Sequence, residues 1–303
     1  MNGLVFIDGV DVAQYGIESV NGYASLLAYP EMREPISEEW AEYDGVEVDL
    51  SDPKLKEKEV ELSFTIRDVG SGESFVAAVS QPGYRTIYIP LFGRSWNLRY
   101  LSQGTPVIYK NTVSFTVKFS SDFPLRREGL KRGHGMPIPP TNKYWMDGVD
   151  LSDYGLVVLE AKPSLYQAPA LRESLVVSNS VMDGVLYDVD LANFKPKDLV
   201  FKMAFICNTP NRLIDNYEAF FKDLVSPDER ALSSLFMIDR PRFFYKNASN
   251  FSFSCMSNVS ILEFDLTITF ISARPTLLDI LLATEAYELV ITEDDYFINL
   301  NPL

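Results

Sequence analysis

The chain has 303 residues, of which 47% are hydrophobic and 13% aromatic, and it carries a formal net charge of −15. This composition is that of a folded protein and excludes an intrinsically disordered chain. The acidic excess disfavours nucleic-acid binding through phosphates, which requires clustered Lys and Arg. Charge of this size also serves solubility, so it does not by itself distinguish a soluble surface from one that repels DNA.

The residues that usually carry catalysis or bind metals are sparse. Cys207 and Cys255 lie in no metal-ligand or redox spacing, and each continues the alternation of a predicted strand, so both are expected to be buried thiols. There is no Gly-rich phosphate loop, Gly-x-Ser-x-Gly elbow or His-Glu-x-x-His motif. The one histidine, His134, lies between two glycines. We predict no catalytic residue, no metal site and no cofactor, although the many carboxylates leave a paired-carboxylate hydrolase open.

The sequence also gives no sign of a membrane segment. No apolar run approaches the length needed to cross a bilayer, and the N-terminal segment lacks a basic region followed by a long apolar stretch. We therefore expect synthesis in the cytoplasm and no membrane partner.

A pattern near the N-terminus recurs in the middle of the chain. Phe6-Ile7-Asp8-Gly9-Val10-Asp11 with Tyr15-Gly16 corresponds to Trp145-Met146-Asp147-Gly148-Val149-Asp150 with Tyr154-Gly155, and Asp147 lies 139 positions after Asp8. The same spacing relates three further groups: Pro30 and Pro169, Arg33-Glu34 and Arg172-Glu173, and Asp44-Gly45 and Asp183-Gly184. Matches at one long spacing indicate a duplicated domain, since solenoid and propeller repeats are shorter. These residues are our candidates for the structural positions that define the repeat.

The repeat predicts four segments. A first β domain covers residues 1–124, a linker 125–144, a second copy of the domain 145–275 and a C-terminal extension 276–303. The linker is rich in Gly, Pro and basic residues, and we expect it to be solvated, with docking on an acidic surface as the alternative. The extension is apolar and is expected to form a hairpin that covers a sheet edge or a partner.

Each copy is expected to begin with a hairpin. The Asp8-Gly9 and Asp147-Gly148 pairs supply the positive φ angles that a two-residue turn needs. The clearest strands follow at Val60 to Ile66 and at Leu199 to Phe205, where apolar residues alternate with others.

In the second copy, Thr209-Pro210 is a helix start, and apolar residues from Leu213 to Leu224 recur with helical spacing. The first copy has a shorter helix at Glu73 to Val79. Further strands are predicted at residues 86–90, 96–101, 113–119, 235–239, 242–246, 251–255 and 262–271. The copies are expected to end in register, because Phe119 to Pro124 and Phe270 to Pro275 have the same separation. The predicted fold is mainly β: a β-sandwich or split barrel with one packed α-helix, duplicated in tandem.

The order of these features resembles the N-terminal domain of bacteriophage distal tail proteins, which share a fold with tail-tube proteins. The resemblance runs through the Asp-Gly hairpin, Tyr15-Gly16, the Pro and Arg-Glu that follow, Asp44-Gly45 and a Lys-rich approach to the strand Val60 to Ile66. The second copy is similar through Tyr154-Gly155, Asp183-Gly184 and Lys197 to Ile206.

The resemblance implies a structural protein of the virion tail, assembled in the host bacterial cytoplasm. In that family a ring around the DNA channel joins the tube to the baseplate or tip. The implied partners are further copies of the chain, other tail or baseplate proteins, and DNA as passing cargo. Two ring domains per chain imply a trimer that builds a pseudo-hexameric ring, or a hexamer.

Three other interpretations stay open from the sequence. The protein could be the major tail-tube protein. It could be a glycan-binding adhesion module, with Trp40, Trp96 and Tyr100 as stacking platforms. It could also be a tail-associated hydrolase.

Overall fold

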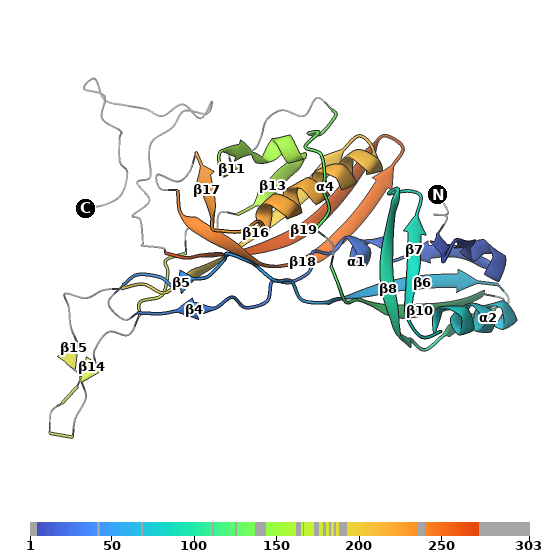
Figure 1. Cartoon of the computed structure of the whole chain (residues 1–303), viewed down its shortest axis with the longest axis horizontal. Helices are drawn as coiled ribbons and strands as arrows, with labels where there is room; N and C mark the ends of the chain where they lie inside the picture. Colours follow the sequence, from blue (N-terminus) through green and yellow to red (C-terminus); the bar gives the residue numbers. More distant parts are fainter. Residues whose placement is uncertain are drawn as a thin grey trace.

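The protein is mainly β, with two large antiparallel sheets that lie beside each other along the long axis (Figure 1). The computed structural model describes residues 5–272 except 41–42, 68, 111, 125, 137–143, 162–164, 166, 173–175, 178–179, 182, 185, 188–192 and 236–239. The predicted C-terminal extension, 276–303, lies outside the described residues. We call the part that carries the first sheet the first half and the part that carries the second sheet the second half.

The two sheets have corresponding strand orders. The first is ordered β2 (Val10–Asp11), β1 (Phe6–Ile7), β7 (Tyr84–Ile89), β8 (Arg94–Gln103), β10 (Thr112–Ser121), β6 (Lys58–Ile66) and β3 (Ile17–Asn21), with β9 (Val107–Tyr109) also paired to β10. The second is ordered β12 (Val149–Asp150), β11 (Tyr144–Met146), β17 (Arg230–Ser234), β18 (Arg242–Met256), β19 (Val259–Phe270), β16 (Lys197–Cys207) and β13 (Leu156–Glu160). The two orders therefore match strand by strand: β2 corresponds to β12, β1 to β11, and so on to β3 and β13.

Small elements also correspond between the halves. The 3-10 turns η1 (Val12–Tyr15) and η2 (Leu151–Tyr154) follow the first hairpins. The two-residue hairpins β4 (Ser37–Glu38) with β5 (Glu47–Val48), and β14 (Val176–Val177) with β15 (Leu186–Tyr187), lie at the same 139-residue spacing as the sequence repeat. A short helix, α1 (Tyr23–Leu27), precedes the first of these hairpins.

The long helices pack on the sheets through aromatic side chains. In α2 (Val69–Val79), Phe75 contacts Phe64 of β6 with ring centroids 4.7 Å apart. In α4 (Pro210–Leu224), Phe220 contacts Phe205 of β16 at 5.9 Å. Helix α4 begins as predicted, because the Thr209 side chain accepts a hydrogen bond from the Arg212 backbone N–H and Pro210 occupies the first turn.

The alternating strands bury the faces that their patterns predict. The inward side chains of β6 and β19 are almost fully buried: Val60, Leu62, Phe64 and Ile66 in β6, and Leu262, Phe264, Leu266, Ile268 and Phe270 in β19. Buried apolar side chains of both halves belong to one continuous cluster. The two sheets therefore share a core.

Several strand boundaries differ from the prediction. A strand that was not expected, β17, lies at Arg230–Ser234. Of the strand expected at 235–239, Leu235 is in a turn and 236–239 lie outside the described residues. The strands expected at 242–246 and 251–255 are one long strand, β18, with irregular pairing at two places.

The register at the end of the two copies was also wrong by two residues. Lys58 pairs with Ser121, while Lys197 pairs with Phe270. Ser121 and not Phe119 therefore corresponds to Phe270, because strand pairing and not the distance to a proline fixes which residues are equivalent.

Candidate functional site at the contact between the two halves

A long connection of the first half crosses the second half. We call residues 29–57, between α1 and β6, the first arm; it contains the β4–β5 hairpin and runs along the second sheet to its far end (Figure 1). The Met32 N–H donates to the Lys246 carbonyl at 3.0 Å, and the Tyr245 hydroxyl donates to the Pro30 carbonyl at 2.9 Å. Further along, the Val46 N–H donates to the Ile271 carbonyl at 3.0 Å.

Tyr29 anchors the start of the first arm. Its ring stacks between Tyr217 at 4.6 Å and Phe221 at 4.3 Å, both from α4. It also meets Phe251 and Phe264 edge-on at 5.7 and 5.6 Å, and its hydroxyl donates to the Tyr217 carbonyl. Burial raises the pKa of Tyr29 well above its usual value, so the hydroxyl stays protonated.

The tip of the first arm is hydrogen-bonded to the second half. The Gly45 N–H donates to the Phe194 carbonyl at 2.8 Å, and Asp44 accepts from the Phe194 N–H at 2.9 Å. Buried Arg172 donates to the Gly45 carbonyl. Gly45 has φ +77°, and a Cβ there would stand 1.9 Å from the Ile271 oxygen. This close approach requires glycine.

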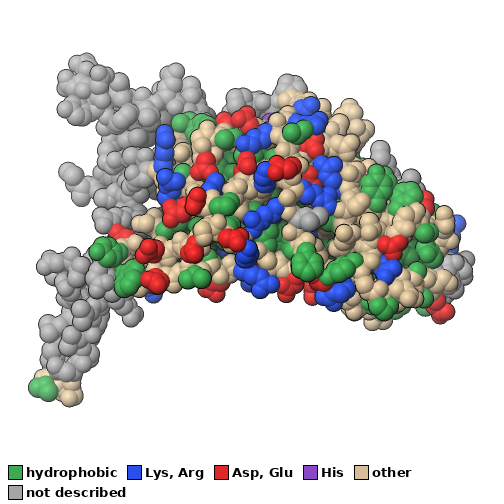
Figure 2. Space-filling view, viewed as in Figure 1, with side chains coloured by type: hydrophobic (Ala, Val, Ile, Leu, Met, Phe, Trp, Pro, Cys, Tyr) green, Lys and Arg blue, Asp and Glu red, His purple; other side chains and the backbone are tan. Residues whose placement is uncertain are grey.

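Helix α4 presents an acidic face to basic residues of the first half and the linker. The Glu218 carboxylate is 7% exposed; Arg94 Nη2 lies 2.8 Å from it and Arg127 Nη1 lies 3.5 Å from it. Arg94 also pairs with Asp215 at 3.0 Å. Acidic and basic side chains lie close together over the middle of the molecular face in Figure 2. These ion pairs tie α4 to the first sheet.

The linker docks on the acidic face of α4, which corrects the expectation that it is solvated. Arg132 pairs with Asp215 and Lys131 with Asp223, each at 2.9 Å. A Cβ on Gly129 would lie 2.2 Å from the Asp215 carbonyl oxygen, so the linker backbone lies directly against the helix. The linker's basic side chains gain acidic partners by this route, because Asp215, Glu218 and Asp223 of α4 pair with Arg132, Arg127 and Lys131.

His134 and Cys207 take part in the same packing. The His134 Nδ1 lies 2.9 Å from the Ile206 carbonyl oxygen. Cys207 is buried as predicted, and burial raises the pKa of its thiol to about 11, which keeps it protonated at neutral pH. Cys255 is exposed, so the expectation that both thiols are buried was wrong for this residue. It pairs with Ser260 next to the turn that joins β18 and β19.

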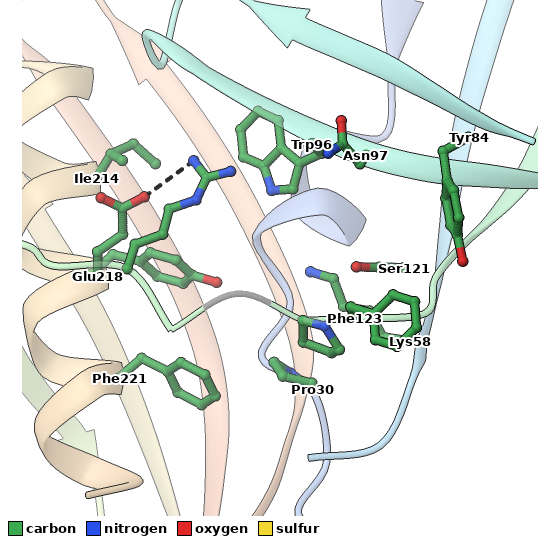
Figure 3. A pocket seen from close by; sticks show the side chains of 13 residues that line it. Pro30, Lys58, Tyr84, Trp96, Asn97, Ser121, Phe123, Ile214, Glu218 and Phe221 are labelled. Carbon is green, nitrogen blue, oxygen red and sulfur yellow. Dashed lines mark ion pairs between the residues drawn. The ribbon is translucent and has the colours of Figure 1, made fainter. Parts of the chain in front are cut away.

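A cavity of about 240 Å³ lies between the halves. Figure 3 shows Lys58 and Trp96 of the first half opposite Phe221 and the Glu218 carboxylate of α4, with Pro30 of the first arm at its side. The walls combine apolar and aromatic side chains with the Arg127–Glu218 ion pair and with Lys58.

Lys58 is the charged group of this cavity whose protonation the fold changes most. Its ammonium donates to the carbonyls of Leu26 and Ala28, each at 2.6 Å. The side chain as a whole is half-buried, but its charged end lies inside the protein. Burial, together with the nearby charge of Arg127, lowers the pKa of Lys58 to about 7.

We predict that Lys58 makes stability depend on pH. An unfolded lysine keeps its proton to about pH 10.4, whereas folded Lys58 releases it near pH 7, so folding becomes more favourable as pH rises between these values. From pH 7 to 9 the free energy of unfolding should rise by about 1–2 kcal/mol relative to that of Lys58→Met. Urea denaturation across this range measures the difference, and parallel pH curves for the two proteins would contradict the assignment.

The predicted repeat residues occupy corresponding places in the two sheets. Asp8 accepts from the Thr86 N–H at 2.8 Å and from Arg85 at 3.0 Å. Asp147 accepts from the Ala231 N–H at 2.7 Å and from Arg230 at 3.1 Å. Gly9 and Gly148 follow these aspartates with φ +82° and +81°.

The next pair of repeat positions supports the helices. Tyr15 meets Phe75 edge-on at 5.6 Å, and Tyr154 meets Phe220 at 5.4 Å. Gly16 and Gly155 end the preceding 3-10 turns in the left-handed conformation. The Tyr154 hydroxyl also donates a hydrogen bond to Asp223 at 2.6 Å.

The remaining repeat positions differ between the halves. Arg33 is exposed and pairs with Glu57 at 3.4 Å, whereas Arg172 is buried and pairs with Glu39 at 3.3 Å. Glu34 is exposed, and Glu173 lies outside the described residues. Pro169 is buried.

The aromatic residues proposed as sugar platforms are placed differently. Trp40 is half exposed. Trp96 lies beneath the Arg127 guanidinium, 5.4 Å from the ring centroid, and its edge meets Phe92. Tyr100 packs edge-on against Phe119. Trp96 is thus part of the contact between the halves.

Sequence reasoning missed the residues that make this contact. Tyr29 and Glu218 were not singled out, because Tyr217 lies 188 positions from Tyr29 and Arg94 lies 124 positions from Glu218. A signal was available for Glu218: Asp215 and Glu218 lie three positions apart in the predicted helix and so share one face, and a basic linker precedes the helix in the chain.

Within the described part of the chain, no helix is long and apolar enough to cross a membrane. The same residues contain no group of three or more His, Cys, Asp or Glu side chains arranged to hold a metal ion.

Comparisons with known proteins give a single kind of match. No protein-family model matches the chain, and no curated protein matches its sequence. Among solved structures, the chain is similar to SPP1 Dit (gp 19.1), described as a paradigm of the hub adsorption apparatus in phages that infect Gram-positive bacteria. That similarity covers 89% of this chain and 99% of the other, with 13% identity and a TM-score of 0.31.

Proposed function

We propose that the chain is a non-catalytic structural component of a phage or prophage tail: a distal tail or baseplate hub protein that forms a ring around the DNA channel. The observation that carries the proposal is the contact between two halves of corresponding strand order, in which an arm of the first half lies on the sheet of the second. A head-to-tail contact of this kind builds a ring when the rotation between successive copies closes on itself.

In this proposal the halves are tandem copies of one domain, with the boundaries 1–124, 125–144, 145–275 and 276–303. The matched bonds of Asp8 and Asp147 to the next strand support the equivalence of the copies. Each chain supplies two ring positions, so three chains make a pseudo-hexameric ring.

The place in the tail comes from the sequence pattern shared with distal tail proteins. The net charge of −15 fits the wall of a channel through which DNA passes without sticking. Other tail or baseplate proteins would bind the two faces of the ring. The tube protein is the nearest alternative within this class, since it would use the same ring.

Immunogold electron microscopy of tailed particles from the source culture tests the proposal. Antibody raised against the purified chain should label one position at the distal end of the tail. Label along the full length of the tube would favour the tube protein. Tailed particles that contain the chain nowhere in their tails would refute the tail role.

A further inference from the structure

The connection of the second half that corresponds to the first arm has the same internal hydrogen bonds. We call residues 168–196 the second arm. In the first arm, the Arg33 N–H donates to the Lys54 carbonyl and the Lys56 N–H to the Glu31 carbonyl. In the second, the Arg172 N–H donates to the Asn193 carbonyl and the Lys195 N–H to the Ala170 carbonyl, each pair 139 positions later. The described parts of the two arms are therefore built alike.

The arms differ in what they touch. The β4–β5 hairpin of the first arm lies along the second sheet, whereas the β14–β15 hairpin projects away from both sheets (Figure 1). Gly45 and Gly184 have φ +77° and +82°, yet a Cβ on Gly184 would meet nothing within 4 Å. In the first arm a backbone group approaches Gly45 so closely that only glycine fits. Gly184 is the equivalent residue, but no group of the described residues approaches it.

The first arm binds the second sheet at Tyr245 and Lys246, and the first sheet has a corresponding surface. In the first sheet Tyr100 pairs with Phe119, and Phe119 pairs with Val60. In the second sheet Tyr245 pairs with Ile268, and Ile268 pairs with Leu199. Val60 and Leu199 are 139 positions apart, so Tyr100 and Tyr245 hold equivalent positions. Tyr245 is fully buried and bonds the arm, whereas the Tyr100 hydroxyl makes no hydrogen bond to any described residue. Leu101, at the position of Lys246, is 38% exposed.

A second part of the first sheet is also exposed where the equivalent part of the second sheet is covered. Ile108 pairs with Val113 as Phe253 pairs with Leu262, so Ile108 and Phe253 hold equivalent positions. Phe253 packs on Phe92 of the first half with centroids 5.2 Å apart. Ile108 is 67% exposed, and its neighbours Val107 and Tyr109 are exposed to a similar degree. An apolar strand this exposed indicates a surface that a partner covers.

We propose that the second arm of one copy docks on the first sheet of the next copy, reproducing between chains the contact that joins the halves within a chain. The Leu171 N–H then donates to the Leu101 carbonyl of the next copy, as the Met32 N–H does to the Lys246 carbonyl. This inference rests on the proposed ring-forming function and identifies its interface.

Chemical cross-linking between chains tests the docking. A tagged Ala170→Cys chain and an untagged Leu101→Cys chain, both with Cys255→Ser, are co-expressed and treated with a short bismaleimide. Both positions are exposed in the single chain. The expected product is a cross-link between a tagged and an untagged chain. Neither variant expressed alone should give a cross-linked pair of chains.

The equivalent pair within one chain is the matched control. Glu31 and Lys246 hold the positions of Ala170 and Leu101, so Glu31→Cys with Lys246→Cys should cross-link inside a single chain. Efficient reaction of this control without any product between the 170 and 101 variants would overturn the docking. Label on tails without this cross-link would leave the tail role intact and refute only the interface.

A charge placed on the docking surface gives a second readout. Leu101→Glu should reduce the assembled fraction about tenfold or more, because it puts a carboxylate under an apolar contact. Val200→Glu is the control, since Val200 is similarly exposed and the first half has Glu61 at the equivalent position. Equal assembly of the two variants, measured by light scattering, would contradict the proposed surface.

Discussion

Replacing Tyr29 with alanine should lower the free energy of unfolding by about 3–5 kcal/mol. The ring is 3% exposed and stacks between Tyr217 and Phe221, so its removal leaves a cavity between the first arm and α4. The residue belongs to the first half and its partners to the second. The loss therefore measures how strongly the halves hold each other.

The matched control for Tyr29→Ala is Tyr29→Phe, which keeps the ring and removes the hydroxyl bonded to the Tyr217 carbonyl. It should cost about 1 kcal/mol. Urea denaturation followed by circular dichroism gives both values. A Tyr29→Ala protein within about 1 kcal/mol of the native chain would show that the first arm contributes little to stability.

Replacing Glu218 with alanine should lower the free energy of unfolding by about 2–4 kcal/mol. The Arg94 guanidinium makes three hydrogen bonds of 2.8 to 3.1 Å to this carboxylate, and Arg127 lies close by. Removal of the buried acid leaves Asp215 as the carboxylate partner of Arg94 among the described residues. The effect stays below that of a fully buried pair, because Arg94 is 28% exposed.

Glu128→Ala is the control, because Glu128 pairs with Lys222 of the same helix but is 81% exposed. Its loss should cost less than about 1 kcal/mol. A double-mutant cycle with Arg94→Ala isolates the coupling between Arg94 and Glu218. Coupling near zero would mean that the ion pair does not join the halves.

Local patterns in the sequence predicted the elements that local chemistry determines. The Asp8-Gly9 and Asp147-Gly148 turns form because both residues of each turn adopt positive φ. Thr209 caps α4, and β6 and β19 alternate as their residues require. In each case, the determining interaction lies within a few residues along the chain.

The path of the first arm could not be predicted in this way. Met32 bonds to Lys246 and Gly45 to Phe194, and no periodicity encodes contacts at such separations. The linker was misjudged for the same reason, since its basic residues pair with carboxylates of a distant helix. The strand at Arg230–Ser234 was missed because it has fewer apolar residues than the segment that follows.

The 139-residue spacing was the most useful pattern in the sequence, and from the sequence alone it predicts only a duplicated domain. In the structure the same spacing relates two arms with different surroundings. The first arm binds the second sheet of its own chain, and in our proposal the second arm binds the first sheet of another copy.

Native mass spectrometry of the purified chain, with negative-stain imaging of the same sample, would show whether copies join head to tail into a closed ring. We expect a species of three chain masses, seen as an open-centred ring with six similar positions. A chain that stays monomeric at every concentration, or that forms two-fold symmetric dimers, would contradict it.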